Sequence, residues 1–427
     1  MNPLMRIGFA LATAGVAALI KACGQDTGKT DVYVDGPHTS GSEIPDGGTK
    51  TDAGTTPVTD RYLDAGTVED AGTPDAGLDG GMVTQDLRVD VNISSGSFLA
   101  YFATDWTNGF FGKFDFQNRQ PPLPSESSVS STDAILRSID GTLYRLDRIN
   151  GTLSFRDKSF TLMGNLQDIV IPPNTNKAYI SRLDINALWV IDLTNGNLIK
   201  IFDLIPYTFE DEDRLARAAQ MALVDNRYLL VLLQDLNTDF SANASGKVVV
   251  IDTETDEILR AISLNGRNPM DITYAPHPNL QATFVTCQGG GYPADLTTSY
   301  GGIERIPYRG DGEFGEPEMF IHDETLEGSP REIRIGSATH GFVAVDTSTF
   351  TTNLHRFNPQ NNQEQGALVY QGEAFIGDFT LATNFNEAIV AVVPQGLVTF
   401  NPATRQGPAD DEIIPLALPP QSFVFTE

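Results

Sequence analysis

Short runs of alternating apolar and polar residues fill the chain from residue 86 onward. The first run, DLRVDVNIS at 86–94, places Leu87, Val89, Val91 and Ile93 on one side. A period of two residues is the pattern of a strand with one buried face. Similar short runs follow to the C-terminus, separated by Gly, Asn, Pro and Asp. The pattern therefore predicts a domain of strands over 86–427.

One stretch of this domain, residues 165–204, contains four apolar runs joined by three polar turns. Its last part, VIDLTNGNLIKIFDL at 190–204, aligns without a gap with VIDTETDEILRAISL at 250–264. A unit that recurs along a chain indicates a repeat fold. One segment departs from the strand pattern: FEDEDRLARAAQM at 209–221 has acidic residues in its first turn and Thr208 as a cap, which predicts a helix.

The repeated signature is an apolar strand that ends in Asp or Asn, followed by a polar turn and another strand. Its copies end at Asp115, Asp147, Asp192, Asp252, Asn358 and Asn401, and a degenerate copy at 304–307 lacks the acid. An Asp or Asn side chain accepts hydrogen bonds from backbone N–H groups two residues further on, which starts a tight turn. We therefore interpret Asp192 and its equivalents as turn-forming residues rather than catalytic acids.

Two more strands precede most copies in a constant order. They pair 168–172 with 177–181, 270–274 with 281–285, 331–335 with 341–345, and 377–381 with 387–392. The unit is thus a four-stranded meander, and seven units in a row suit a β-propeller, which leaves no long sheet edge exposed. The sequence predicts an all-β, seven-bladed β-propeller behind a disordered N-terminal tether. Six or eight blades stay open alternatives, because the first two units are short.

The strands DIVIP, KAYIS and LWVIDLTNG within residues 165–204 resemble the YVTN-type β-propeller repeat of bacterial cell-surface and periplasmic proteins. The resemblance extends over about residues 95–420 and is also clear at 245–288. It implies a propeller in an exported protein. It implies no particular activity, because propellers host many unrelated functions.

Residues 1–22 have the composition of an export signal. Arg6 precedes an apolar run, Ile7 to Ile20, that is too short to span a bilayer comfortably but suits the core of a secretory signal. Ala22 followed by Cys23 resembles the lipobox of bacterial lipoproteins, in which cleavage before the cysteine leaves it as the lipidated first residue. The resemblance implies a signal peptide at 1–22 and a lipid anchor on Cys23. An ordinary secretory peptide is the alternative.

The residues next to Cys23 affect how efficiently the signal peptide is cleaved and to which membrane the lipoprotein is sent. Lys21 departs from the small or apolar residue that the lipobox has there, which puts the efficiency of processing in question. Gly24 is not the Asp that retains such proteins in the inner membrane. The resemblance therefore implies an outer-membrane lipoprotein of the cell envelope, either periplasmic or surface-exposed.

Residues 23–85 form an acidic, Asp-Ala-Gly-rich tether. Between Gly24 and Asp86 there are 13 acidic and 3 basic residues, and the whole chain has a formal charge of −28. A segment with so little to bury stays disordered. The charge disfavours nucleic acid as a partner and favours a soluble monomer whose membrane contact is the lipid anchor.

No catalytic motif is recognisable. The five His residues show no spacing of a zinc helix, and no nucleophile elbow or phosphate-binding loop occurs. Cys287 lies in a strand-like run and is interpreted as a buried apolar residue, and His340 and His355 as structural. We therefore expect no cofactor and lean against an enzyme. A propeller hydrolase, lactonase-like and with a metal in the central channel, is the alternative, which inward-pointing Asp, Glu, Asn or His would favour.

Three loops are candidates for contact with a ligand. Asp235, Asn237 and Asp239 alternate like calcium ligands, although the loop lacks the Gly and the closing Glu of such a site, so a polar hairpin competes with calcium.

Two loops offer contact area to a partner. Gly290, Tyr292 and Tyr300 belong to a long Gly-rich connection, in which Gly permits close backbone approach and Tyr offers amphipathic surface. Trp106 lies in another loop. The primary hypothesis is a non-enzymatic scaffold that binds a protein or glycan through loops on one propeller face.

Overall fold

The computed structural model describes residues 98–115, 128–129, 131–209, 215–242, 244–277, 279–290, 300–348, 351–362, 366–371, 374–382, 387–393, 396–400, 413–416 and 418–426. Residue contacts divide the chain into Met1–Met82 and Val83–Glu427, and every described residue belongs to the second unit. The signal peptide, the tether with Cys23 and the strand expected at 86–94 lie outside the described residues. Neither helical segment within the described ranges has the length and hydropathy of a membrane span.

The described residues form seven four-stranded antiparallel sheets, which we number as blades 1 to 7. Blade 1 holds β28 (Pro420–Thr426), β1 (Phe98–Thr104), β2 (Gly109–Asp115) and β3 (Ser128–Val129). Blade 2 holds β4 (Ala134–Ile139), β5 (Thr142–Asp147), β6 (Thr152–Phe155) and β7 (Lys158–Thr161). Blade 3 holds β8 (Leu166–Val170), β9 (Lys177–Arg182), β10 (Ala187–Asp192) and β11 (Leu198–Asp203).

The second half of the chain repeats the arrangement. Blade 4 holds β12 (Ala218–Val224), β13 (Tyr228–Leu233), β14 (Ser245–Asp252) and β15 (Glu257–Arg267), and blade 5 holds β16 (Pro269–Ala275), β17 (Ala282–Gln288), β18 (Gly301–Pro307) and β19 (Glu318–His322). Blade 6 holds β20 (Ser329–Ile335), β21 (Gly341–Asp346), β22 (Thr352–Phe357) and β23 (Ala367–Gln371), and blade 7 holds β24 (Phe375–Ala382), β25 (Glu387–Val393), β26 (Gly396–Phe400) and β27 (Ile413–Ile414). The helical segments are η1 (Ile205–Tyr207) and α2 (Asp323–Leu326).

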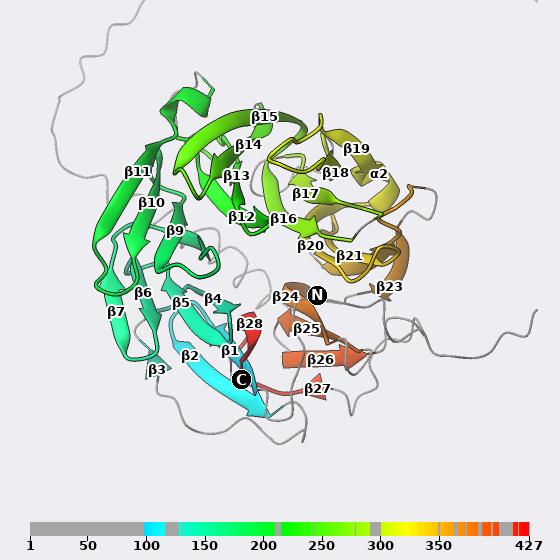
Figure 1. The fold of residues 1–427 in the computed structure, drawn as a ribbon. Coiled ribbons are helices and arrows are strands. Elements are labelled where there is room, and N and C mark those ends of the chain that lie inside the picture. The colour runs from blue at the N-terminus through cyan, green and yellow to red at the C-terminus, as the bar shows by residue number, and fades with distance from the viewer. Residues whose placement is uncertain are drawn as a thin grey trace, which may run out of the picture. The chain divides into compact units, whose positions relative to one another are not determined.

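The first strand of each blade lies innermost. These strands contact one another in the order β28, β4, β8, β12, β16, β20, β24 and back to β28. The seven sheets therefore stand around a common centre, as Figure 1 shows. Seven sheets confirm the predicted β-propeller and, for the described residues, its blade number.

Blade 1 joins the two ends of the described chain. β28 pairs antiparallel with β1, from Phe98 opposite Thr426 to Ala103 opposite Pro420. Phe423 and Phe425 pack with Leu99 and Tyr101 in one buried cluster. The ring is therefore closed by a sheet and not by a loop.

The meander gives the ring two distinct faces. Because each blade has four antiparallel strands, every blade begins at the same face. Turns between first and second strands, and between third and fourth strands, lie on what we call the turn face. Loops between second and third strands, and the links from one blade to the next, lie on the opposite side, the connector face.

The buried strands explain the blade packing. β13 is buried along its whole length and β17 likewise, as expected for apolar runs in the middle of stacked sheets. Leu230 and Val250 of blade 4 pack in one cluster with Ile272 and Val285 of blade 5. Successive blades thus share their hydrophobic cores.

Most of the predicted repeat positions are confirmed. The strands of six copies are third strands: β2, β10, β14, β18, β22 and β26, which end at Asp115, Asp192, Asp252, Pro307, Phe357 and Phe400. Asn401, the last residue of its copy, lies outside the described residues. Asp192 forms a turn as predicted, since its carboxylate accepts from the Thr194 N–H at 2.8 Å and the Thr194 hydroxyl at 2.6 Å.

Two predictions were wrong. The copy ending at Asp147 lies in β5, a second strand, because the turn residues Asp147 and Asn150 imitate the signature on the other face. The helix expected at 209–221 is not formed over its described C-terminal part, where β12 begins at Ala218. The core position between blades 3 and 4 overrides the helical propensity of that segment.

Candidate functional site

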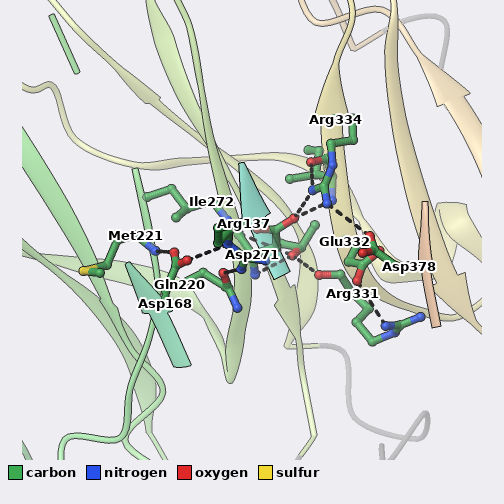
Figure 2. Close-up of polar contacts among 12 residues, drawn as sticks. Arg137, Asp168, Gln220, Met221, Asp271, Ile272, Arg331, Glu332, Arg334 and Asp378 are labelled. Atoms are coloured by element: carbon green, nitrogen blue, oxygen red, sulfur yellow. Dashed lines mark hydrogen bonds and ion pairs between the residues drawn. The ribbon is translucent and has the colours of Figure 1, made fainter. Parts of the chain in front are cut away.

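Carboxyl groups recur at one position of the inner strands. Asp168, Asp271, Glu332 and Asp378 each follow a register irregularity in β8, β16, β20 and β24. A β-bulge inserts one extra residue and re-aims the side chain next to it. The bulges thereby collect these groups in the centre of the ring, where Figure 2 shows them with three arginines.

Three of these carboxylates bind the next inner strand. Asp168 accepts from the Met221 N–H at 2.9 Å, Asp271 from the Ile333 N–H at 3.0 Å, and Asp378 from the Phe423 N–H at 3.1 Å. Ser422 in β28 does the same for the Leu136 N–H at 3.1 Å. Each side chain therefore ties one blade to its neighbour.

Arg137 extends from β4 across blade 3 to blade 4. Its Nε donates to Asp168 at 2.7 Å, and its Nη2 donates to the side-chain oxygen of Gln220 at 2.5 Å. Burial raises the pKa of Asp168, although Arg137 and the Met221 N–H oppose that effect. The guanidinium thus compensates a carboxylate that is almost removed from water.

Arg334 makes the matching bridge on the other side of the channel. Its Nη1 donates to Asp271 at 2.7 Å, and its Nη2 lies 3.5 Å from Asp378. Arg334 itself belongs to β20, so the three residues join blades 5, 6 and 7. Burial lowers the pKa of Arg334, but the surrounding carboxylates reverse this and raise it.

Glu332 is the exception in this network. Its Oε1 accepts from Arg331 Nη1 at 3.4 Å, whereas its buried Oε2 has no hydrogen-bond partner among the described residues. Burial, reinforced by the Asp378 carboxylate, raises the pKa of Glu332 to about 8. Burial therefore favours the protonated form of Glu332. Arg331 lies 3.4 Å from both Glu332 and Asp346, whereas Arg137 and Arg334 face the three aspartates, as Figure 2 shows.

The channel carboxylates do not fit a metal ion well. Asp168 and Asp271 already face guanidinium groups at 2.7 Å, which a cation would have to displace. Within the described ranges, no group of three or more His, Cys, Asp or Glu is arranged to hold a metal. Whether the channel holds a metal ion is decided by elemental analysis of the purified protein.

The oxygens of the 235–239 loop are directed to separate partners. Asp235 accepts from the Phe209 N–H at 3.0 Å, and Asp239 accepts from the Ser241 N–H and hydroxyl. The Asn237 carboxamide donates to the Ser241 hydroxyl at 2.7 Å. These bonds are those of the polar hairpin loop that the sequence also allowed, and calcium binding stays a prediction.

The candidate partner-binding residues lie on the connector face. Trp106 is in the β1–β2 loop with 45% of its surface exposed, and Tyr300 is in the β17–β18 loop with 46% exposed. The carbonyl of the buried Gly290 accepts from Asn268 Nδ2 at 3.0 Å, so it fixes the start of that loop. Tyr292 lies outside the described residues.

Several exposed apolar side chains share the connector face. Of eleven exposed large apolar residues in the described part of the chain, six lie in connector-face loops: Trp106, Ile149, Met163, Ile205, Phe209 and Tyr300. The other five lie on the outermost strands β11, β15 and β23, where Leu198 directly follows the β10–β11 turn. The sequence alone did not show that the six loops share one face, because that follows from the strand order.

Two of these aromatic rings carry a cation. Arg267 lies over the Tyr300 ring at 3.7 Å, and Lys247 lies over the Phe209 ring at 3.8 Å. The Lys247 side chain is only 14% exposed, and its ammonium group donates to the Tyr207 carbonyl at 2.7 Å. The connector face therefore presents the two aromatic rings, and the partly exposed Arg267 lies over one of them.

Cys287 and the two C-terminal His residues have structural surroundings. Cys287 is buried, and its thiol donates to Glu304 at 3.5 Å. His355 Nδ1 pairs with the Gly366 carbonyl at 2.8 Å, and His340 lies in a turn with Ser337 and Thr339. Burial raises the pKa of the Cys287 thiol, which makes it a poor nucleophile.

Neither a protein-family model nor a curated protein matches this chain. Solved structures resemble it in fold. A proposed 6-phosphogluconolactonase from Bacteroides uniformis is 15% identical, with a TM-score of 0.55 over 78% of this chain and 100% of that one. A similar protein from Bacteroides fragilis is 13% identical, with a TM-score of 0.54 over 79% and 100%. The periplasmic gluconolactonase PpgL of Pseudomonas aeruginosa is 12% identical, with a TM-score of 0.52 over 78% and 99%. At these identities the likeness shows the β-propeller fold alone.

Proposed function

We propose that this protein is a cell-envelope lipoprotein whose propeller binds a protein or glycan partner through its connector face, without catalysis. The lipidated residue is Cys23, and the acidic tether lets the propeller reach away from the membrane. The export-signal composition of residues 1–22 and the likeness of 165–204 to YVTN-type repeats support this address. The protein is proposed to act as a monomer.

The single observation that carries the binding role is that six exposed large apolar residues lie in connector-face loops, spread over blades 1 to 5. Aromatic residues and Arg dominate the energetics of protein interfaces. Arg267 over the Tyr300 ring supplies that combination. On the opposite face, no described turn contains an exposed large apolar residue, although Leu198 directly follows the β10–β11 turn.

Site-specific photo-crosslinking in intact cells tests the role of the face. A photoreactive amino acid at Tyr300 or Phe209 is expected to give a discrete crosslinked species, because the partner covers these rings. The same amino acid at Gln360, an exposed turn-face residue, is the control and should give none. Equal crosslinking from both faces would contradict a dedicated connector face.

The second arm uses truncation of single side chains. Tyr300→Ala should lower the yield of the Phe209 crosslink about tenfold, as expected for an aromatic hot spot. Leu259→Ala is the matched control, since Leu259 is also 46% exposed but lies on the outer strand β15. An unchanged yield in Tyr300→Ala, with its melting temperature also unchanged, would remove Tyr300 from the contact.

A second candidate function is hydrolysis in the central channel. Glu332 favours it, because a buried carboxylic acid with a pKa of about 8 is suited to donate a proton at neutral pH. Inward-pointing Asp and Glu side chains of Figure 2 also meet the expectation set for a hydrolase. All three solved structures described above carry gluconolactonase names, which suggests a lactone as the substrate to try.

The lactonase candidate is tested with D-glucono-1,5-lactone and a pH indicator. The expected result for an enzyme is acid release faster than spontaneous hydrolysis, and its loss in Glu332→Gln. Arg309→Gln, on an exposed turn, is the control for charge change at the surface. Acid release at the spontaneous rate, with or without added Ca²⁺ or Zn²⁺, would exclude this substrate.

A further inference from the structure

A cleft opens on the turn face between blades 2 and 3, away from both the channel and the connector face. Its volume is about 230 Å³, and its walls come from the β4–β5 turn, strands β5 to β7, the β8–β9 loop and the β10–β11 turn. Pockets for drug-sized ligands begin at about 300 Å³. The cleft therefore suits a ligand of monosaccharide size.

Two rings form the apolar wall of this cleft. Tyr144 and Phe155 lie with their centroids 4.9 Å apart, and both are buried. Phe155 also packs against Phe160, and the Tyr144 and Phe155 rings are each only 7% exposed, so the cleft is lined by ring edges. No hydrogen bond of the Tyr144 hydroxyl is found among the described residues, which leaves it able to bond a sugar hydroxyl.

Two cations line the same cleft. The ammonium group of Lys158 is fixed by the carbonyls of Leu193 at 2.9 Å and Thr194 at 3.1 Å. Arg156 Nη2 donates to the Thr142 hydroxyl at 3.0 Å, which leaves further N–H groups of this exposed side chain for a ligand. A guanidinium with open N–H groups recognises carboxylate through paired hydrogen bonds.

One carboxylate limits the charge of the ligand. Asp140 lies in the β4–β5 turn on the same cleft and, with Arg156, acts electrostatically on the Tyr144 phenol. The two cations and Asp140 give the lining residues a formal charge of +1, and Asp192, next to Leu193, also interacts electrostatically with Lys158. So little positive charge matches a carboxylate better than a dianionic phosphate monoester.

We propose that the cleft between blades 2 and 3 is a binding site for a monosaccharide acid of the uronate type. Arg156 pairs with the carboxylate, the Tyr144 hydroxyl bonds a sugar hydroxyl, and the sugar ring lies against the exposed edges of the Tyr144 and Phe155 rings. The site is independent of the connector-face function proposed above.

Isothermal titration calorimetry of the full-length protein with D-galacturonate tests the site. D-Galactose, which lacks the carboxylate, is the neutral comparison. Galacturonate should bind and galactose should bind about tenfold more weakly or not at all, because it cannot pair with Arg156. Arg156→Gln should weaken galacturonate binding about tenfold, and Tyr144→Phe about three- to tenfold. Arg309→Gln, a turn-face Arg in blade 5, should bind like the wild type.

Asp140→Asn separates recognition from folding. Removal of this carboxylate should tighten galacturonate binding several-fold, whereas a merely structural role predicts no gain. Circular-dichroism melting of each variant checks that the blades remain folded. No galacturonate binding by the wild type, equal binding of galactose, or unchanged binding by Arg156→Gln would each overturn the proposal.

Discussion

The carboxyl group of Glu332 differs from its three equivalents in the inner strands. Asp168, Asp271 and Asp378 each accept a backbone N–H from the next blade, but Glu332 Oε2 is buried without a partner in the described part of the chain. Burial therefore favours the protonated side chain in the folded protein. This preference lowers the stability of the fold at pH values at which the same side chain is ionised in the unfolded chain.

Wild-type stability should fall as the pH rises from about 5 to 8, by up to about 1.4 kcal/mol per pH unit from Glu332. The sign follows from a folded pKa of about 8 against an ordinary value of 4.5: the contribution is complete below 4.5 and is lost as pH rises through 8. Glu332→Gln keeps the neutral form. Urea unfolding across this pH range should give a smaller slope for the variant.

Asp168 and Asp378 also have raised pKa values because of burial, so part of the pH dependence will remain in Glu332→Gln. The difference between the pH dependence of wild-type stability and that of Glu332→Gln therefore gives the contribution of Glu332. Parallel stability curves for wild type and variant would show that Glu332 is ionised in the folded protein.

Between elements, the inner strands are joined by side chains as well as by packing. Arg334 of β20 contacts Asp271 of β16 and Asp378 of β24, so one guanidinium connects three blades. Arg137 connects blades 2, 3 and 4 in the same way. The channel network is thus a set of inter-blade braces.

Arg334→Met should destabilise the fold by about 3–5 kcal/mol, because it leaves two largely buried carboxylates without their cation. The matched control is Arg309→Met, whose exposed ion pair with Glu313 is worth at most about 1 kcal/mol. Urea unfolding measures both. A loss no larger than that of the control would mean that water, and not Arg334, compensates Asp271 and Asp378.

At the scale of strands, the sequence pattern predicted most of the elements, but it did not predict the side-chain contacts between the inner strands. Alternation and the terminal Asp or Asn placed most third strands correctly, because these signals are local. The copy at Asp147 failed because turns on both faces use the same Asx chemistry. The segment at 218–221 failed because burial between blades outweighs helix propensity.

The network joins residues that are far apart in the chain, such as Arg137 and Gln220, so no local pattern reveals the contacts. One signal was present: an acidic residue recurs before Ile or Phe in the first strand of four units, at Asp168, Asp271, Glu332 and Asp378. An acid in an otherwise apolar inner strand indicates a partner in the channel.

For the whole molecule, ring closure depends on β28. Phe423 and Phe425 are buried against Leu99 and Tyr101, and β28 supplies the inner strand of blade 1. Without it, β24 and β4 lose the neighbour that lies between them in the ring.

Deletion of residues 420–427 should abolish the cooperative thermal transition and make the chain sensitive to protease. Deletion of 24–85 is the control, and it should leave the melting temperature unchanged, because the tether has little to bury. Circular-dichroism melting and limited trypsin digestion measure both proteins. A truncated chain that melts cooperatively at the full-length temperature would show that the ring closes without β28.

The partnership of β1 and β28 also sets the order of events when the protein is made. A chain leaves the ribosome, or an export channel, from its N-terminal side, so FLAYFAT of β1 is available long before its partner. During this interval an apolar strand edge is open to pairing with another chain. Yield should therefore depend on how fast synthesis or transport proceeds to residue 426, and on a holding chaperone that covers β1 in the meantime.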